Sequence, residues 1–158
     1  MGTRSLTLIK QHDGVEIAVL YRHHDGYPTG HGADIKRVLA GKQVHSGLGA
    51  DLTKMVNGDG DMAVQLIVGL KVALSGVKQD GQVRAGGLYL YPPGTRDCWE
   101  EYVYEVYCGA PPTKSSAGGA IRLVVHRGDA VGPVIYDGPL DDFDPHVCEP
   151  SDDEDEDE

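Results

Sequence analysis

Residues 6–21 read Leu-Thr-Leu-Ile-Lys-Gln-His-Asp-Gly-Val-Glu-Ile-Ala-Val-Leu-Tyr, and this stretch decides the fold class. Two strand-like runs, residues 6–9 and 15–21, flank Asp13-Gly14. Asp-Gly between such runs favours a hairpin, because the tight turn needs residues that accept a positive φ. Alternate side chains of the second strand should share one face, and these are Val15, Ile17, Val19 and Tyr21.

Two helices are predicted after the hairpin. The first is short and ends at Gly41; its apolar residues at helical spacing are Ala33, Ile35, Val38 and Leu39. The second covers residues 62–74, with Asp61 as the expected N-cap. Because apolar residues surround nearly its whole circumference, we expect this helix to be largely buried. Residues 42–60 are glycine-rich and give only a possible helical turn around residues 52–56.

The second half of the chain is typical of strands. The expected strands are residues 87–91, 102–107, 120–126 and 134–136. Strands that follow one another through short connections favour antiparallel pairing. The sequence therefore predicts an α+β fold, with a single mostly antiparallel sheet of about six strands and two or three helices packed on it.

Charge is distributed unevenly along the chain. The net charge is -11, yet from Asp137 onward there are twelve acidic residues and no Lys or Arg, which leaves the rest near neutral. We therefore predict one globular domain over residues 1–138 and a disordered acidic tail over residues 139–158. The domain lacks the basic excess that nucleic-acid binding normally requires, so no nucleic-acid partner is expected for it.

Cysteine usage and hydropathy suggest a cytoplasmic protein. The three cysteines show no Cys-x-x-Cys spacing, which favours reduced thiols. The N-terminus has no apolar run typical of a signal peptide, and the longest apolar stretch, residues 62–74, is too short to span a bilayer. We expect no membrane partner, and the oligomeric state stays open.

The segment at residues 21–32 is the candidate binding loop. It reads Tyr-Arg-His-His-Asp-Gly-Tyr-Pro-Thr-Gly-His-Gly and lies between a predicted strand and a predicted helix. Loops held by rigid elements are where binding groups concentrate. Its last residues open a helix, whose free N–H groups favour an anion. The alternative is a tight structural turn that needs glycine for its geometry alone.

A second loop, residues 94–101, carries the only tryptophan together with an arginine, and such residues are frequent at recognition surfaces. We expect a small anionic ligand or a host protein to be held between the two loops. The residues assigned to this site are Arg4, Arg22, Asp25, Gly26, Tyr27, Gly30, His31, Gly32 and Arg96.

Metal binding and cofactor chemistry are not expected. His23 and His24 are adjacent, so they point to opposite faces if the strand continues through them, and they cannot converge on one metal. The chain contains no nucleophile elbow, P-loop or dinucleotide fingerprint. No catalytic residue is identified.

The opening Gly2-Thr3-Arg4-Ser5 and the Asp-Gly-Tyr-Pro-Thr-Gly segment at 25–30 resemble a family of small uncharacterised bacteriophage and prophage proteins. Residues 89–94 and 100–106 are similar to that family too, so the resemblance covers much of residues 1–108. It implies a phage origin, and hence the cytoplasm of a host cell, but no mechanism.

Together these features favour a phage accessory protein that acts as a non-enzymatic binding module. The alternative is a small hydrolase-like enzyme that uses the 21–32 loop, with Asp25 and His31 as acid and base, or with Thr3 as nucleophile if the chain were trimmed to begin there. The acidic run at residues 152–158 offers a third role, which is to engage a basic partner or mimic nucleic acid rather than only to aid solubility.

Overall fold

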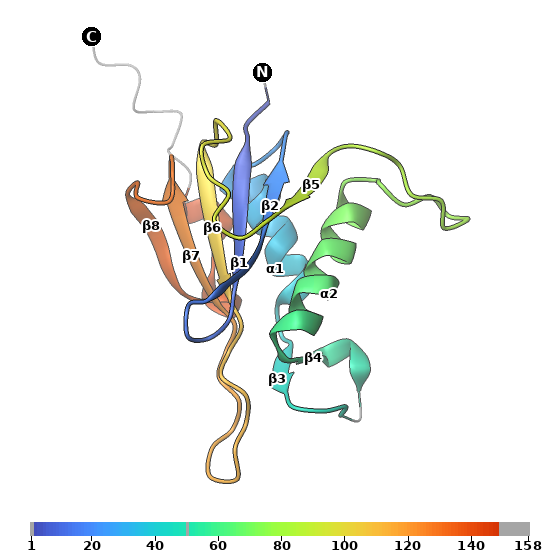
Figure 1. Cartoon of the computed structure of the whole chain (residues 1–158), viewed down its shortest axis with the longest axis vertical. Helices are drawn as coiled ribbons and strands as arrows, with labels where there is room; N and C mark the ends of the chain where they lie inside the picture. The colour runs from blue at the N-terminus through green and yellow to red at the C-terminus, as the bar shows by residue number, and fades with distance from the viewer. Residues whose placement is uncertain (1, 50, 149–158) are drawn as a thin grey trace.

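The computed structural model describes residues 2–49 and 51–148, and these form the predicted α+β fold. A large sheet carries two α-helices on one face, and a small two-stranded sheet lies beyond one end of it (Figure 1). The elements are β1 (Ser5–Lys10), β2 (Glu16–Arg22), α1 (Ala33–Leu39), β3 (Gln43–His45), β4 (Met55–Asn57), α2 (Gly58–Ala73), β5 (Leu88–Tyr91), β6 (Tyr102–Tyr107), β7 (Arg122–Arg127) and β8 (Val134–Pro139).

The large sheet has the strand order β5-β2-β1-β6-β7-β8. The mostly antiparallel arrangement predicted from the sequence is confirmed, and the exception is the parallel pairing of β1 with β6. This parallel pair lies at the centre of the sheet, where residues Ser5–Ile9 of β1 are all buried. Burial on both faces is typical of parallel strands.

The β1–β2 hairpin forms as predicted, but its second strand contains a bulge. Ile9 pairs with Ala18 and Lys10 pairs with Glu16, so Ile17 is an extra residue on β2. The bulge turns Ile17 toward the helix side of the sheet, whereas Val19 and Tyr21 pack on the opposite side. The prediction that these side chains share one face is therefore wrong for Ile17.

Helix α2 is buried on one side only, which corrects the prediction of all-round burial. Met62, Ala63, Leu66 and Leu70 pack into the core between α2 and the sheet. The outer valines are each more than half exposed, and they are Val64, Val68 and Val72. No described element covers that outer face, so apolar residues there gain no burial.

The start of α2 also differs from the prediction. The helix begins at Gly58, and its N-cap residue is Asn57. The side chain of Asp61 lies within the first turn, where it accepts the backbone N–H of Asn57 at 2.8 Å. Asp61 therefore bonds back from the first turn of the helix to its N-cap residue, and it is not itself the N-cap.

The end of the folded region lies beyond the predicted boundary at residue 138. Leu140, Phe143 and Cys148 are buried, and the ring of Phe143 stacks edge-on against Tyr136 with centroids 5.1 Å apart. These apolar residues anchor two short helical turns, Leu140–Asp142 and Pro145–Cys148, although the segment is acidic overall. The rest of the predicted tail, residues 149–158, lies outside the described residues.

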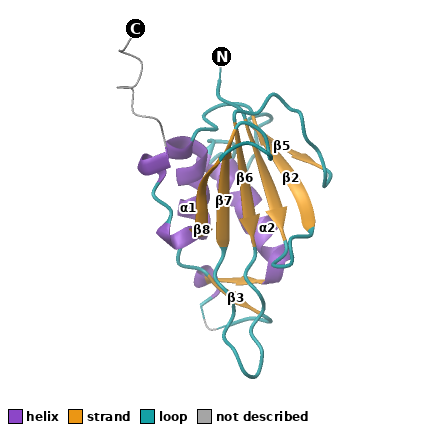
Figure 2. Ribbon diagram, turned by 90° about the vertical axis from the view of Figure 1, so that its left-hand side faces the viewer, coloured by secondary structure: helices purple, strands orange, loops and turns teal. Residues whose placement is uncertain are grey.

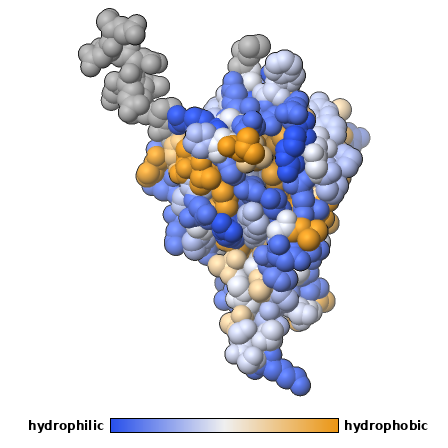
Figure 3. All heavy atoms as spheres, turned by 60° about the vertical axis from the view of Figure 1, so that its left-hand side comes forward, coloured by the Kyte–Doolittle hydropathy of each residue, from blue (hydrophilic) through white to orange (hydrophobic). Residues whose placement is uncertain are grey.

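The sheet face away from the helices is partly open. Cys98 and Ala130 pack on a small apolar cluster there, formed by Leu6, Leu8, Val19 and Val103. Figure 2 shows the helices behind the sheet and a long loop between β6 and β7 that extends past β3. From the β8 side, the surface is mostly polar with separate apolar groups (Figure 3). In the described part of the chain, no helix is long and apolar enough to cross a membrane.

The one-sided burial of α2 predicts a contrast between two of its apolar positions. Leu66→Ala should lower the free energy of unfolding by ~2–5 kcal/mol, because it leaves a cavity in the core. Val68→Ala should lower it by no more than ~0.5 kcal/mol, because Val68 is mostly solvated. Urea denaturation of both variants measures the difference, and equal losses would contradict the observed packing.

Candidate functional site

The predicted binding loop is a tightly hydrogen-bonded turn. The N–H of Gly26 donates to the carbonyl of Thr3 at 2.9 Å, and the N–H of His31 donates to the carbonyl of Asp25 at 2.9 Å. Asp25 adopts a φ of 57°, a conformation that Asp tolerates better than most residues. The turn leads through a π-helical segment, Pro28–Gly32, directly into α1.

Arg22 points into the protein and is only 4% exposed. Its guanidinium donates to three acceptors: the carbonyl of His24 at 2.7 Å, Asp34 Oδ2 at 2.6 Å and His31 Nδ1 at 3.2 Å. A guanidinium has no acceptor, so His31 Nδ1 must be the unprotonated nitrogen. His31 then carries its proton on Nε2 and donates it to Thr7 Oγ1 at 2.5 Å.

His31 is fully buried and electrically neutral. Burial, and secondly the positive charge of Arg22, hold the pKa of His31 well below its usual value of 6.5. Its ring also stacks edge-on against Tyr104, with centroids 4.9 Å apart. Both ring nitrogens are used inside the fold, and a ligand has no access to them.

The glycines of the loop allow close packing rather than ligand approach. A Cβ at Gly30 would lie 2.4 Å from the carbonyl oxygen of Asp25, and one at Gly32 would lie 3.0 Å from the ring of Phe143. The carbonyl of Gly26 accepts the hydroxyl of Tyr104 at 2.7 Å. These contacts are what the structural-turn alternative requires.

The remaining assigned residues do not join the loop in a common site. Arg96 lies on the other face of the sheet from Arg22, where it donates to both carboxylate oxygens of Glu16 at 2.6 and 3.1 Å. Asp25 and Tyr27 are exposed, and Arg4 is half-buried. None of the nine assigned residues lines any of the pockets described below.

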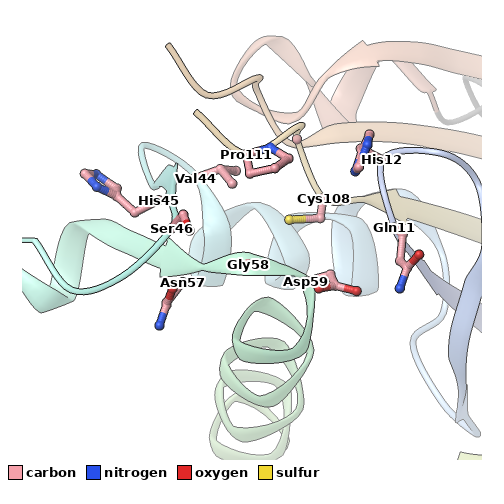
Figure 4. A pocket seen from close by; sticks show the side chains of 11 residues that line it. Gln11, His12, Val44, His45, Ser46, Asn57, Gly58, Asp59, Cys108 and Pro111 are labelled. Carbon is pink, nitrogen blue, oxygen red and sulfur yellow. The ribbon is translucent and has the colours of Figure 1, made fainter. Parts of the chain in front are cut away.

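A different pocket, of about 400 Å³, lies at the opposite end of the sheet (Figure 4). It lies between the β1–β2 turn, β3, the start of α2 and the segment after β6. Its lining residues are Gln11, His12, Val44, His45, Ser46, Asn57, Gly58, Asp59, Cys108, Gly109 and Pro111. We call it the α2 pocket.

The small sheet places one wall of the α2 pocket. β3 and β4 pair in parallel and bury Val44 and Val56, which sets His45 opposite Asn57. Asn57 accepts the N–H of Gly47 at 2.7 Å and forms no side-chain cap on α2. A φ of 79° at Gly58 lets the chain pass from β4 directly into the helix. The first turn of α2 lines the pocket, and its N-cap residue provides no side-chain cap.

Cys108 lies in the middle of the α2 pocket, between the two histidines (Figure 4). It is only 3% exposed, and burial followed by the negative charge of Asp59 raises the pKa of its thiol to about 11. The group is therefore a thiol and not a thiolate at neutral pH, which makes it a poor nucleophile. No group of three or more His, Cys, Asp or Glu side chains in the described residues is arranged to hold a metal ion.

Two more hollows flank the α2 pocket, and His45 lines all three. One has a volume of about 480 Å³ and includes Lys42. The other, of about 240 Å³, includes Asp51 and Lys54. The surface around β3 thus combines imidazole, ammonium, amide and carboxylate groups, which suits the binding of a polar molecule more than covalent chemistry.

Sequence reasoning missed this site because its walls come from four separate segments. Residues 42–60 show only glycine and scattered polar residues, a pattern equally typical of an ordinary loop. Comparisons of the chain with family models, with curated proteins and with solved structures find no match. The site is therefore defined by geometry alone.

The buried neutral state of His31 predicts a pH-dependent stability. Unfolded His31 takes up a proton below about pH 6.5, whereas the folded residue does not, so stability should fall as the pH drops from 7 to 5. Its share of the slope approaches ~1.4 kcal/mol per pH unit. Urea denaturation from pH 5 to 8 should show a shallower slope for His31→Gln. Parallel curves for the two proteins would refute this.

The raised pKa of Cys108 predicts low reactivity. In the folded chain at pH 8, iodoacetamide should modify the half-buried Cys98 before Cys108, as read by mass spectrometry of the peptides. The rate at Cys108 should keep rising up to pH 10, because the thiolate fraction is still growing there. Rapid modification of Cys108 at pH 8 would show that the thiol is activated.

Proposed function

We propose that this chain is a non-enzymatic binding module that holds a small anionic, polar ligand in the α2 pocket. The observation that carries the proposal is a pocket at the first turn of α2 that polar residues from four chain segments line, around a thiol that is not activated. A volume of about 400 Å³ lies within the range typical of small-molecule sites.

The arrangement of donors and acceptors supports a ligand with one anionic group and additional hydroxyl or amino groups. The start of α2, a helix of 16 residues, favours a negatively charged oxygen, and Ser46 and His45 offer further hydrogen bonds beside it. The carboxylate of Asp59 disfavours a second anionic group on the ligand and accepts from a hydroxyl or amino group instead. A sugar monophosphate or a nucleoside monophosphate has this chemistry.

The alternative of a hydrolase-like enzyme at the 21–32 loop receives less support. Its acid–base pair would need His31 to reach a substrate, but both ring nitrogens of His31 are hydrogen-bonded inside the fold. The resemblance to phage proteins supports a ligand from the host cytoplasm, and that origin is part of the proposal.

Thermal unfolding with adenosine monophosphate, ribose 5-phosphate or inorganic phosphate tests the proposal. A ligand at 100 times its Kd stabilises the folded state by about 2.7 kcal/mol, which raises the Tm by several degrees. His45→Ala should remove the shift, because it deletes one wall of the pocket.

The matched control is His146→Ala, which removes an exposed histidine outside the pocket and should leave the shift intact. The proposal fails if none of the three compounds raises the Tm, or if the shift survives in both His45→Ala and Ser46→Ala.

A further inference from the structure

The end of the sheet opposite the α2 pocket carries an exposed tryptophan. Trp99, the only tryptophan of the chain, is 83% exposed. It lies in the loop between β5 and β6, where Asp97 has a φ of 61° and Trp99 itself a φ of 62°. An exposed indole buries no apolar area on folding. The loop nevertheless holds it outward, in a backbone conformation that bulky residues rarely adopt.

Three carboxylates line the same hollow as this indole. Asp97, Glu100 and Asp129 form with Trp99 an open hollow of about 360 Å³, which we call the Trp99 hollow. The two loops that supply them are joined by the hydrogen bond from the N–H of Gly128 to the carbonyl of Glu101, at 2.7 Å.

The carboxylates of the Trp99 hollow are not held in ion pairs. Of the described residues, none forms an ion pair with Asp97, Glu100 or Asp129. The neighbouring Arg96 is ion-paired with Glu16, and its charge also interacts more weakly with Glu100. Moreover, Glu100 Oε1 is buried and has no hydrogen-bond partner in the described part of the chain, although its other oxygen accepts the N–H of Cys98 at 2.8 Å.

We infer that the Trp99 hollow binds an arginine or lysine side chain of a partner protein. A guanidinium or ammonium is attracted to the face of an indole, and the carboxylates add charge-assisted hydrogen bonds. The three carboxylates of the hollow favour a basic protein segment and disfavour nucleic acid.

The surroundings of the hollow fit a protein partner better than a free small cation. Val131 is 91% exposed in the same β7–β8 turn as Asp129, and it offers an apolar contact beside the charged ones. Tyr21, Tyr89 and Tyr91 cluster on adjacent strands of the sheet face that Cys98 covers, with ring centroids 6.0 to 6.5 Å apart. Tryptophan and tyrosine are typical of the energetic centre of an interface.

The emission of Trp99 reports on this site alone, because the chain has no other tryptophan. The test titrates the full chain with the peptide acetyl-Gly-Arg-Val-Arg-Gly-amide and with its citrulline counterpart, which keeps the shape and removes the charge. The arginine peptide should change the emission with a saturating curve, and the citrulline peptide should bind at least fivefold more weakly. No saturable change, or equal responses to the two peptides, would overturn the inference.

Variants locate the binding to the hollow. Glu100→Gln and Asp129→Asn should each raise the Kd for the arginine peptide at least fivefold, and calorimetry should show the same for Trp99→Leu. Asp80→Asn is the matched control, since Asp80 is an exposed carboxylate that also accepts one backbone N–H, and its Kd should be unchanged. An unchanged Kd in both Glu100→Gln and Asp129→Asn would refute the site. His45→Ala should bind the peptide normally, so this inference and the proposed α2 pocket fail or succeed separately.

Discussion

The buried ion pair between Arg22 and Asp34 is the interaction on which the N-terminal half of the fold depends. It joins the end of β2 to α1, and through His31 and Thr7 it also reaches β1. Removing one partner of such a pair typically costs ~3–5 kcal/mol, because the other charge stays buried without compensation. Asp34 has a second partner in Arg37, but that guanidinium is mostly exposed and contributes much less. The network thus fixes where α1 packs on the sheet. Because Arg22 and Asp34 bind each other, neither charge is left to bind a ligand.

The hairpin, the first helix and the strands of the second half could be predicted because each follows from a local pattern. Asp13-Gly14 demands a turn, and Gly41 ends α1 with a φ of 74°. The parallel pairing of β1 with β6 could not be predicted, because it joins segments almost a hundred residues apart and has no local signal. The all-round burial predicted for α2 was wrong because the sequence of a helix with an apolar surface does not show whether a second layer covers it.

The structure does not bring the predicted site residues together, and the reason is physical. A glycine-rich loop that contains arginine, histidine and aspartate has the same composition whether these side chains face a ligand or each other. What decides is the direction of the side chains, and Arg22 points inward because it lies two residues after Leu20, on the face of β2 that α1 and the core cover. The α2 pocket shows the converse, since its residues are unremarkable in sequence and become a site only through the pairing of β3 with β4.

The open face of the sheet explains why recognition is expected at the two ends of the molecule. Across the middle of that face, Glu105 bonds to Lys10 and also accepts from His126 Nε2 at 2.8 Å, while His126 Nδ1 lies 3.1 Å from the carbonyl of Gly132. Both nitrogens of His126 thus lie within hydrogen-bond distance of an oxygen atom of the fold. These charges satisfy one another and need no ligand. At the Trp99 hollow the balance is different, because its three carboxylates form no ion pair with any described residue and its indole faces solvent. Charges without an ion pair, polar atoms without a hydrogen-bond partner and exposed aromatic rings are the features that indicate a binding surface. Among the described residues, the Trp99 hollow combines all three.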